Sequence, residues 1–222
     1  MPTSTVEDYL KCILLAEQEA PAARVSTGRI AVALSVAPAT VTSMLKTLAK
    51  SGLVSYEPYS GVSLTDAGSE LALHVLRRHR LVELFLVRVM GMDWSEVHAE
   101  AELLEHSVSE NLIQRIDEML GFPGVDPHGD PIPTAGGEVQ ESEGANLLKC
   151  EVGVAMKVVR VGDQSMEFLR LVEREGLKPG RRLQVRERDE AAESVVLERG
   201  DREPLSLGFG AAAKILVSPV EE

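Results

Sequence analysis

The stretch from His98 to His106, HAEAELLEH, concentrates side chains that can bind a metal ion. On a helix, His98, Glu102, Glu105 and His106 fall at positions i, i+4, i+7 and i+8, so they lie along one face. Imidazole nitrogens and carboxylate oxygens are ligands for divalent first-row metals. The same spacing also occurs on solvated helix surfaces, where such pairs are weak. The stretch is therefore half of a candidate metal site, and ligands from elsewhere must complete it.

A second pair, His79 and Glu83, stands at i and i+4 in the preceding helical run. If the two helices are antiparallel, the two sets converge, which favours a metal site over a solvated surface. Three of the five histidines belong to this arrangement. Of the other two, His74 is expected to be structural or exposed. His128 lies in a segment rich in proline and glycine and is expected to be solvated.

The first 65 residues carry the pattern of a winged helix-turn-helix. Apolar residues at helical spacing predict a helix over residues 5–19. Two shorter helical runs, TGRIAVAL and ATVTSMLKTLAKSG, follow on either side of a tight turn, with Ser26 as the N-cap of the first. The segment LVSYEPYSGVSLT then predicts a β-hairpin, the wing. This module predicts binding to DNA.

The rest of the chain predicts a helical domain followed by a small β domain. A long helix starts at Asp66 and ends before Gly91, a second helical run covers residues 94–119 with a break inside it, and residues 121–146 are irregular. Short strands then predict an SH3-like β-barrel. The expected fold is mainly α with small β parts. Its predicted segments are a winged helix-turn-helix (1–65), a helical metal-binding and dimerisation domain (66–134), a linker (135–146) and an SH3-like domain (147–222).

Composition sets the class of protein. The net charge of -12 argues against indiscriminate binding to nucleic acid, but residues 1–80 are nearly neutral and the acids concentrate in residues 81–130. The two cysteines, Cys12 and Cys150, form no CxxC pattern and fit a reducing compartment. Neither a signal peptide nor a membrane-span pattern is present. We expect a cytoplasmic protein.

In this combination of motifs the chain resembles the diphtheria-toxin-repressor family of metal-dependent transcriptional repressors, which includes manganese transport regulators. The resemblance runs through VEDYL, GRIAVALSVAPATVTSMLKTLAKSGLVSYEPYSGVSLTDAG, RHRLVELFL, VHAEAELLEH and GDPIP to the SH3-like tail. The order of histidines and glutamates is more specific than the helix-turn-helix. The resemblance implies a regulatory metal site of Asp8, Glu102, Glu105 and His106, and an ancillary site of His79, Glu83 and His98 that Gln164 and Glu167 of the SH3-like domain can complete.

The identity of the metal follows from the same resemblance. Iron-responsive members carry a methionine at the position of Asp8 and a cysteine at that of Glu102, whereas manganese-responsive members carry acids there, as this chain does. The expected activator is Mn(II), for which Fe(II), Co(II), Cd(II) and Zn(II) can substitute. Lys11 departs from the pattern, because manganese regulators place another acidic ligand at this position. This departure argues against a closely spaced pair of ions.

The recognition helix is expected to begin near Pro38 and to place its first residues in the major groove of DNA. Small polar side chains there can read base edges, and basic side chains can bind phosphates. The candidate DNA-binding residues are Arg29, Pro38, Ala39, Thr40, Thr42, Ser43, Lys46 and Lys50, with Tyr59 and Ser60 at the tip of the wing.

Together these features predict a metal-dependent repressor that binds operator DNA as a homodimer and controls metal homeostasis. The apolar run LVELFLVRVMGM is the candidate dimer seam, and a two-fold dimer predicts a palindromic operator. An iron-responsive repressor of the same family is the first alternative. A metal-dependent hydrolytic enzyme is another, but no separate base or nucleophile motif appears, so we expect no enzyme. A winged-helix regulator that senses an organic ligand is the third.

Overall fold

The computed structural model describes residues 3–20, 23–140, 144–200 and 202–220. The chain forms two compact units. The first contains residues 1–79, 104–108 and 133–138, and the second contains residues 80–103, 109–132 and 139–222. The short segment 104–108 therefore belongs to the same unit as the N-terminal helices, although it is distant from them in sequence.

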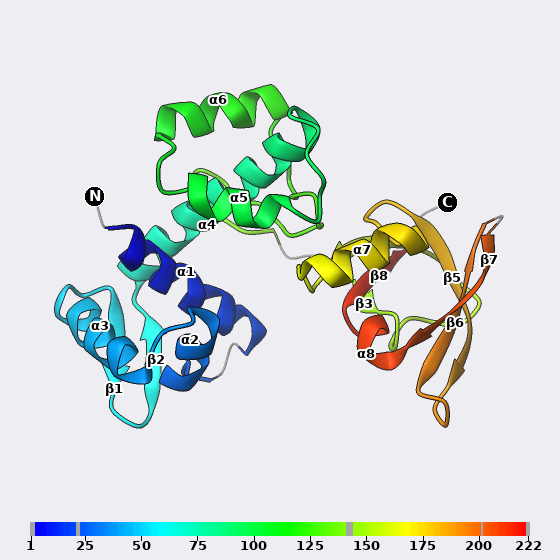
Figure 1. Ribbon diagram of the computed structural model, residues 1–222, viewed down its shortest axis with the longest axis horizontal. Helices are drawn as coiled ribbons and strands as arrows, with labels where there is room; N and C mark the ends of the chain where they lie inside the picture. Colours follow the sequence, from blue (N-terminus) through cyan, green and yellow to red (C-terminus); the bar gives the residue numbers. More distant parts are fainter. Residues whose placement is uncertain (1–2, 21–22, 141–143, 201, 221–222) are drawn as a thin grey trace. The chain divides into compact units, whose positions relative to one another are not determined.

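The first unit contains the expected winged helix-turn-helix (Figure 1). Ser26 caps the second helix through a hydrogen bond from the Arg29 backbone N–H to its hydroxyl, at 3.2 Å. Among the described residues no single helix is long and apolar enough to span a membrane; only α2 and α3 taken together pass that test, across a bend of 110°. The elements are α1 (Ser4–Glu19), α2 (Thr27–Ala33), α3 (Pro38–Lys50), the hairpin strands β1 (Val54–Glu57) and β2 (Gly61–Leu64), and the first part of α4 (Asp66–Arg88).

One apolar core joins α1 to the DNA-binding helices. Leu10 and Ile13 of α1 are completely buried, and they share a hydrophobic cluster with Ile30 of α2 and with Val41 and Leu45 of α3. Large buried side chains that interdigitate resist small displacements, because native cores are close-packed. A constraint on α1 is therefore transmitted to the recognition helix α3.

The second unit begins with the remainder of α4 and contains two helical segments and the β domain. The helical run that the sequence predicts with a break is two helices, α5 (Val97–Leu104) and α6 (Glu110–Leu120). Ser109 caps α6 by accepting the Leu112 N–H, and Gly121 ends it in a left-handed conformation with φ 78°. The break is therefore set by a new N-cap.

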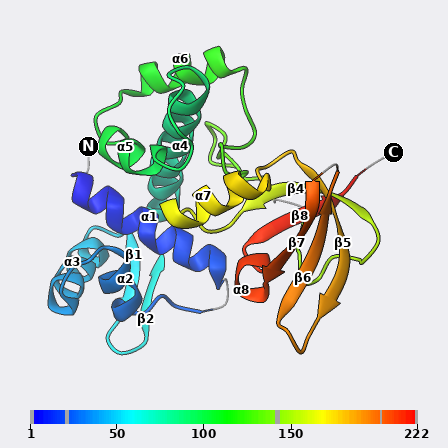
Figure 2. The same ribbon diagram turned by 45° about the vertical axis from the view of Figure 1, so that its right-hand side comes forward.

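The β domain is a strongly curved, barrel-like antiparallel sheet (Figures 1 and 2), whose two end strands are not paired with each other among the described residues. Its strand order is β3-β8-β4-β5-β6-β7, with register shifts inside the β4–β8, β5–β6 and β6–β7 pairs that bend the strands. Strands β3 and β7 were not expected from the sequence. The elements are β3 (Ala145–Asn146), β4 (Ala155–Val161), α7 (Met166–Glu175), β5 (Arg182–Asp189), β6 (Ser194–Arg199), β7 (Arg202–Gly208), α8 (Phe209–Ala212) and β8 (Ile215–Pro219).

These elements confirm the predicted fold class with its winged helix-turn-helix, helical domain and SH3-like barrel. The exact domain boundaries stay a prediction. The linker predicted over residues 135–146 includes residues 141–143, which lie outside the described part of the chain.

The segment that precedes the linker is irregular, as expected, but part of it is buried. A single β-bridge joins Val125 to Pro131, and the chain between them packs on β4. The Val161 N–H donates to the His128 carbonyl at 2.9 Å. Gly129 has φ 89°, and a Cβ there would lie 2.0 Å from the Val159 carbonyl oxygen, so this close approach requires glycine. The expectation that His128 is solvated is wrong, because its side chain is fully buried.

Candidate metal centre

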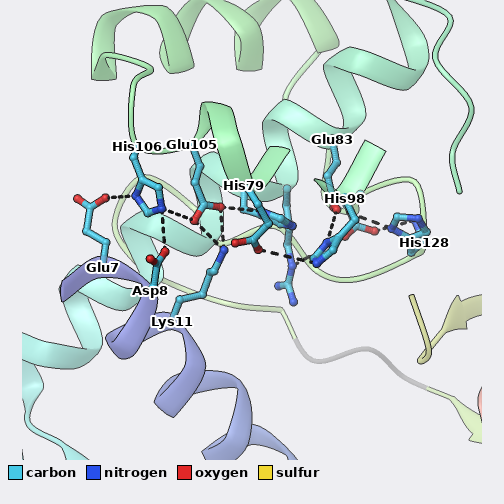
Figure 3. A network of polar contacts seen from close by, with 12 residues as sticks. Glu7, Asp8, Lys11, His79, Glu83, His98, Glu105, His106 and His128 are labelled. Carbon is cyan, nitrogen blue, oxygen red and sulfur yellow. Dashed lines mark hydrogen bonds and ion pairs between the residues drawn. The ribbon is translucent and has the colours of Figure 1, made fainter. Parts of the chain in front are cut away.

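Three of the four expected regulatory ligands come together in the first unit. Asp8 of α1 and the adjacent residues Glu105 and His106 each offer a ligand atom, and these atoms lie within 4.8 Å of one another (Figure 3). We call Asp8, Glu105 and His106 the primary cluster. It joins α1 to the segment 104–108, so an ion bound here links two parts of the unit that are almost 100 residues apart.

The His106 ring lies between carboxylates on both sides. Its Nδ1 is 2.6 Å from Glu7 Oε2, and its Nε2 is 2.8 Å from Asp8 Oδ1 and 3.3 Å from Glu105 Oε1. Glu7 is also paired with Arg78 at 2.8 Å, which holds its carboxylate in place. A neutral imidazole carries one N–H, and the buried Glu7 carboxylate engages Nδ1. The lone pair of Nε2 then faces two carboxylates, an arrangement that a cation between them stabilises.

Glu105 is the centre of the buried charges in this unit. Its side chain has no solvent exposure, and Lys11 donates to both of its oxygens, at 2.7 and 2.9 Å. His79 Nδ1 donates to Oε2 at 2.6 Å. Burial by itself raises the pKa of Glu105, but the hydrogen bond from His79 and the charge and hydrogen bond of Lys11 outweigh it, so its pKa lies below the usual value. Glu105 is therefore a carboxylate, as metal binding requires.

The expected ancillary ligands lie around α4. His79 and Glu83 are one turn apart on this helix. In the second unit, His98 Nδ1 is 3.1 Å from Glu83 Oε1, and His98 Nε2 is 3.8 Å from Glu102 Oε1. Glu102, which the resemblance assigns to the regulatory site, therefore also lies near His98 of the ancillary set.

A further group that the sequence did not suggest lies deep in the second unit. Glu83, Asp126 and His128 are all buried, and each offers a ligand atom within 4.8 Å of the others. We call these three residues the buried group. His128 Nε2 donates to the Trp94 carbonyl at 3.0 Å, so its Nδ1 presents a lone pair, and Nδ1 has no hydrogen-bond partner among the described residues.

The electrostatics of the buried group also suit a cation. Burial first, and then the neighbouring carboxylates of Asp130 and Glu83, raise the pKa of Asp126 well above its usual value. Asp126 Oδ1 accepts the backbone N–H groups of His128 and Asp130, whereas Oδ2 is buried without a hydrogen-bond partner in the described residues. Oxygen and nitrogen atoms that are buried together without hydrogen-bond partners among the described residues are suitable ligands for a divalent ion.

The two candidate ligands from the SH3-like domain lie elsewhere in the second unit. Gln164 donates to Asp130 Oδ2 at 2.7 Å, and Arg160 of β4 pairs with Asp130 Oδ1 at 2.6 Å. Glu167 lies in the first turn of α7, where it is exposed. Asp130 therefore connects the Val125–Pro131 loop to the SH3-like domain, and Gln164 contributes to that connection.

Trp94 borders the buried group. Its ring centroid is 5.3 Å from that of His128, and the Lys178 ammonium lies 4.7 Å from the centroid of the same ring. The side chain is 4% exposed and belongs to the hydrophobic core of the SH3-like domain. Trp94 therefore contacts both the buried group and the barrel core.

The expected DNA-binding residues lie on α3 and the wing. Pro38 has the N1 or N2 position of α3, where its missing N–H costs no helical hydrogen bond. A hollow between α3 and the wing is lined by Thr42, Lys46, Tyr59 and Ser60, among others. Arg29 forms an ion pair with Glu19. The exposed members of the set are Arg29, Pro38, Ala39, Thr40, Ser43, Lys46, Lys50, Tyr59 and Ser60.

The apolar run expected to form the dimer seam is mostly inside the protein. Its side chains from Leu81 to Leu86 are largely buried. The exposed apolar side chains of the run are Val89 (49%) and Met90 (63%), at its end. Other exposed apolar side chains of the second unit include Leu103 (72%) on α5, Leu112 (48%) and Met119 (67%) on α6, and Phe122 (71%) just after α6. Leu112 and Met119 are seven residues apart, so they share one face of α6.

Sequence reasoning missed three residues of these groups. Glu7 is an acid directly before Asp8, and this adjacency is the sequence signal that could have marked it as a partner of the site. Asp126 and His128 stand in DPHGDP, whose prolines and glycine suggested an exposed loop. The alternation of Asp126, His128 and Asp130 is the signal that could have indicated a metal-binding loop.

Comparison with known proteins identifies the family. Residues 1–62 match the family model "Iron dependent repressor, N-terminal DNA binding domain", and residues 65–134 match "Iron dependent repressor, metal binding and dimerisation domain". Residues 145–219 match the FeoA domain. The three models follow one another along the chain in the order of the winged helix-turn-helix, the helices and the barrel.

Individual relatives agree with the family models. The chain is 41% identical over 120 residues to the HTH-type transcriptional regulator MntR of Lysinibacillus sphaericus (strain C3-41), a match that covers 54% of this chain and 84% of the relative. The structure of a manganese-dependent transcriptional repressor in complex with manganese superposes with a TM-score of 0.88 at 39% identity, covering 97% of this chain and all of the other. ScaR with bound Zn²⁺ superposes with a TM-score of 0.80 at 32% identity, covering 99% and 100%. The chain belongs to the iron-dependent, or diphtheria-toxin-repressor, family of metal-responsive DNA-binding regulators, among its manganese-responsive members.

Proposed function

We propose that this protein is a cytoplasmic repressor that binds a palindromic operator as a homodimer when loaded with Mn(II), and thereby controls genes of metal homeostasis. The observation that carries the proposal is the primary cluster, in which Asp8 of α1 meets Glu105 and His106. The manganese-dependent relatives support the choice of metal. The family is one of transcriptional repressors, so the metal ligands need no catalytic role to explain them.

The donor atoms of the primary cluster favour a hard ion. Asp8 and Glu105 contribute carboxylate oxygens, and His106 contributes a nitrogen, a set that contains no sulfur. Oxygen and nitrogen ligands suit Mn(II), whereas a thioether and a thiolate favour softer metals. When bound, the ion would supply a positive charge and a fixed link between these side chains. We propose Glu102 as a further ligand of this site.

The link between metal and DNA passes through α1. Asp8 lies on the same helix as Leu10 and Ile13, whose side chains are fully buried in the core that contains Val41 and Leu45 of α3. Holding Asp8 against the segment 104–108 therefore restricts α1 and, through the core, the recognition helix. Metal raises DNA affinity if it binds this arrangement more tightly than others, and by linkage DNA then raises metal affinity to the same degree.

The exposed residues of α3 and of the wing support a DNA interface. The first two turns of α3 present Ala39, Thr40 and Ser43, small side chains that fit against base edges and thymine methyl groups. Lys46 and Lys50 are exposed further along the same helix and can bind phosphates, which adds affinity that depends on salt. We propose that Tyr59, at the tip of the wing, contacts the DNA backbone.

The test is operator binding as a function of metal, measured anaerobically by electrophoretic mobility shift on the promoter region of the protein's own gene. We expect binding with Mn(II), weaker binding with Fe(II) at the same free concentration, and none in excess chelator. The double variant Asp8→Met, Glu102→Cys should shift the preference towards Fe(II). Operator binding that survives exhaustive chelation would reject a metal-activated repressor, and equal activation by the two metals would reject the manganese preference.

A further inference from the structure

Lys11 brings a positive charge into the primary cluster from within the protein. It lies one turn after Asp8 on α1, and its side chain is 8% exposed. Its ammonium group is within 2.7 and 2.9 Å of the two Glu105 oxygens. Both oxygens are thus engaged by a cation, and one of them also faces His106 Nε2 at 3.3 Å. A divalent ion that binds Glu105 in the primary cluster therefore approaches carboxylate oxygens that already accept hydrogen bonds from Lys11.

The charges around the cluster show what Lys11 changes. Arg78 pairs with Glu7 at 2.8 Å and neutralises it. Of the remaining carboxylates, which are Asp8, Glu105 and the proposed ligand Glu102, Lys11 neutralises one. One divalent ion then balances the other two, whereas two ions would leave two positive charges in excess in a region with little solvent. Unpaired charge at low dielectric is costly, so the second ion is strongly disfavoured.

We propose that Lys11 is a built-in counter-cation of Glu105, which a divalent ion must displace from the carboxylate and which limits the primary cluster to one ion. The inference rests on the proposed function, because it concerns the same metal site. Lys11 can move away from Glu105, because its ammonium group is at the end of a flexible four-carbon chain. The solvent-exposed edge of the site is close, since Asp8, one turn away, has a side chain that is 36% exposed. Competition between the ammonium and the metal would then raise the metal concentration at which the protein responds.

The experiment measures the number and the affinity of bound Mn(II) ions in the absence of DNA, so that its result does not depend on operator binding. The Glu83→Gln background removes the carboxylate that the ancillary ligands and the buried group have in common, so that binding reports on the primary cluster. Wild-type Lys11, Lys11→Met and Lys11→Glu are compared in this background by anaerobic titration against a fluorescent chelator. Electron paramagnetic resonance of the bound ions distinguishes a single Mn(II) from two ions close enough for their spins to couple.

We expect one uncoupled ion with Lys11, one ion bound about tenfold more tightly or better with Lys11→Met, and a second, coupled ion with Lys11→Glu. Lys11→Arg keeps the charge and should bind one ion like the parent. Lys149→Met removes an exposed lysine of the SH3-like domain and should change nothing. Circular dichroism and thermal unfolding in chelator show which variants are folded, and Lys11→Gln replaces Lys11→Met if that variant is not.

Two results would overturn the inference. A coupled pair of ions in the presence of Lys11 would show that the lysine does not limit the site to one ion. An unchanged affinity in folded Lys11→Met or Lys11→Gln would show that the metal does not compete with the ammonium. A wild-type protein that binds no Mn(II) would instead reject the proposed function itself, and this inference with it.

Discussion

Glu7 shows how a residue outside the primary cluster can control it. Its carboxylate binds Arg78 with one oxygen and His106 Nδ1 with the other. A carboxylate that accepts the N–H of a ligating histidine fixes the tautomer and orientation of the ring, and it raises the basicity of the ligating nitrogen. Glu7 therefore determines that Nε2 is the atom that His106 presents to Asp8 and Glu105.

We predict that Glu7→Gln weakens Mn(II) binding by about 10- to 100-fold while the three ligands remain. An amide can turn its NH₂ group towards His106 and reverse the hydrogen bond, which presents the wrong nitrogen to the metal. Titration against a fluorescent chelator measures the change. Glu100→Gln, an exposed residue on α5, is the matched control and should have no effect. Equal affinities in the two variants would mean that Glu7 does not orient His106.

Glu105 gives a second prediction at this scale, which concerns stability and pH. Its pKa in the folded protein is below the usual 4.5, so its ionised form stabilises the fold at neutral pH. This contribution is present above about pH 4.5 and is lost as the pH falls through the lower folded value. We expect Glu105→Gln to cost about 3–5 kcal/mol at neutral pH in chelator, since it leaves Lys11 buried without its carboxylate. The free energies of unfolding of the wild type and of Glu105→Gln, measured in urea, should converge as the pH falls from neutral to acid. A difference that stays constant with pH would contradict a stabilising role of the ionised Glu105.

At the scale of elements, the Val125–Pro131 loop contains a carboxyl group, that of Asp126, whose ionised form is disfavoured by its surroundings. The pKa of Asp126 is raised, so the folded protein binds a proton there more tightly than the unfolded chain does. The sign is therefore opposite to that of Glu105: stability is lost as the pH rises from 3.8 through the raised value. Ionisation of Asp126 therefore costs stability, which Arg80, 3.9 Å from Asp126 Oδ2, offsets only in part.

We predict that Asp126→Asn raises the thermal unfolding temperature in chelator and reduces the further increase that Mn(II) produces. The amide oxygen can still accept the N–H groups of His128 and Asp130 while the repulsion from Glu83 disappears. Differential scanning calorimetry with chelator and with metal measures both changes. A variant that is less stable in chelator would show that Asp126 is an ordinary structural acid.

The start of α4 depends on close packing against the end of the DNA-binding module. A Cβ at Gly68 would lie 1.9 Å from the Leu53 carbonyl oxygen, a backbone atom that cannot move alone. We predict that Gly68→Ala destabilises the protein by about 1–3 kcal/mol or more. Gly28→Ala is the control: it is also helical, no atom lies within 4 Å of its Cβ, and alanine is the better helix former. Chemical denaturation should separate the two variants, and similar stabilities would contradict the packing argument.

How far the sequence predicted these elements depends on how local their signals are. Ser26 and the apolar spacing of α1 to α3 are local, so the helix-turn-helix was predicted closely. β7 was missed because it is an edge strand whose only buried residue is Leu207, which leaves no alternation to detect. His128 was misjudged because its burial comes from β4 and Trp94, contacts that no local pattern contains. The grouping of Asp8 with Glu105 and His106 came from the family resemblance, since spacing alone cannot place residues so far apart.

At the scale of the whole molecule, the exposed apolar side chains of α6 are a candidate surface for a second copy of the chain. Residues 65–134 match a family model described as a dimerisation domain, and Leu112 and Met119 on α6 lie within it. Exposed apolar side chains on one helix face are the usual composition of an interface core. We propose this face of α6, together with Phe122, as part of the dimer contact.

We predict that Leu112→Glu combined with Met119→Glu yields a folded monomer, because opposed copies of the face would bury unpaired charges. Sedimentation velocity measures the state, and operator affinity should fall because a half-site alone remains. Gln114→Glu with Glu118→Gln, which alters the exposed polar side of α6 without a net change of charge, is the control. A double variant that sediments like the wild type would place the interface elsewhere.

Trp94 has a consequence for observing this protein. It is the only tryptophan in the chain, which also contains three tyrosines. The centroid of its ring lies 5.3 Å from that of the His128 imidazole. Indole emission responds to a protonated or metal-bound imidazole nearby, and a paramagnetic ion quenches it. Excitation at the red edge, where tyrosine does not absorb, therefore gives the unlabelled protein an internal optical reporter of events at Glu83, Asp126 and His128.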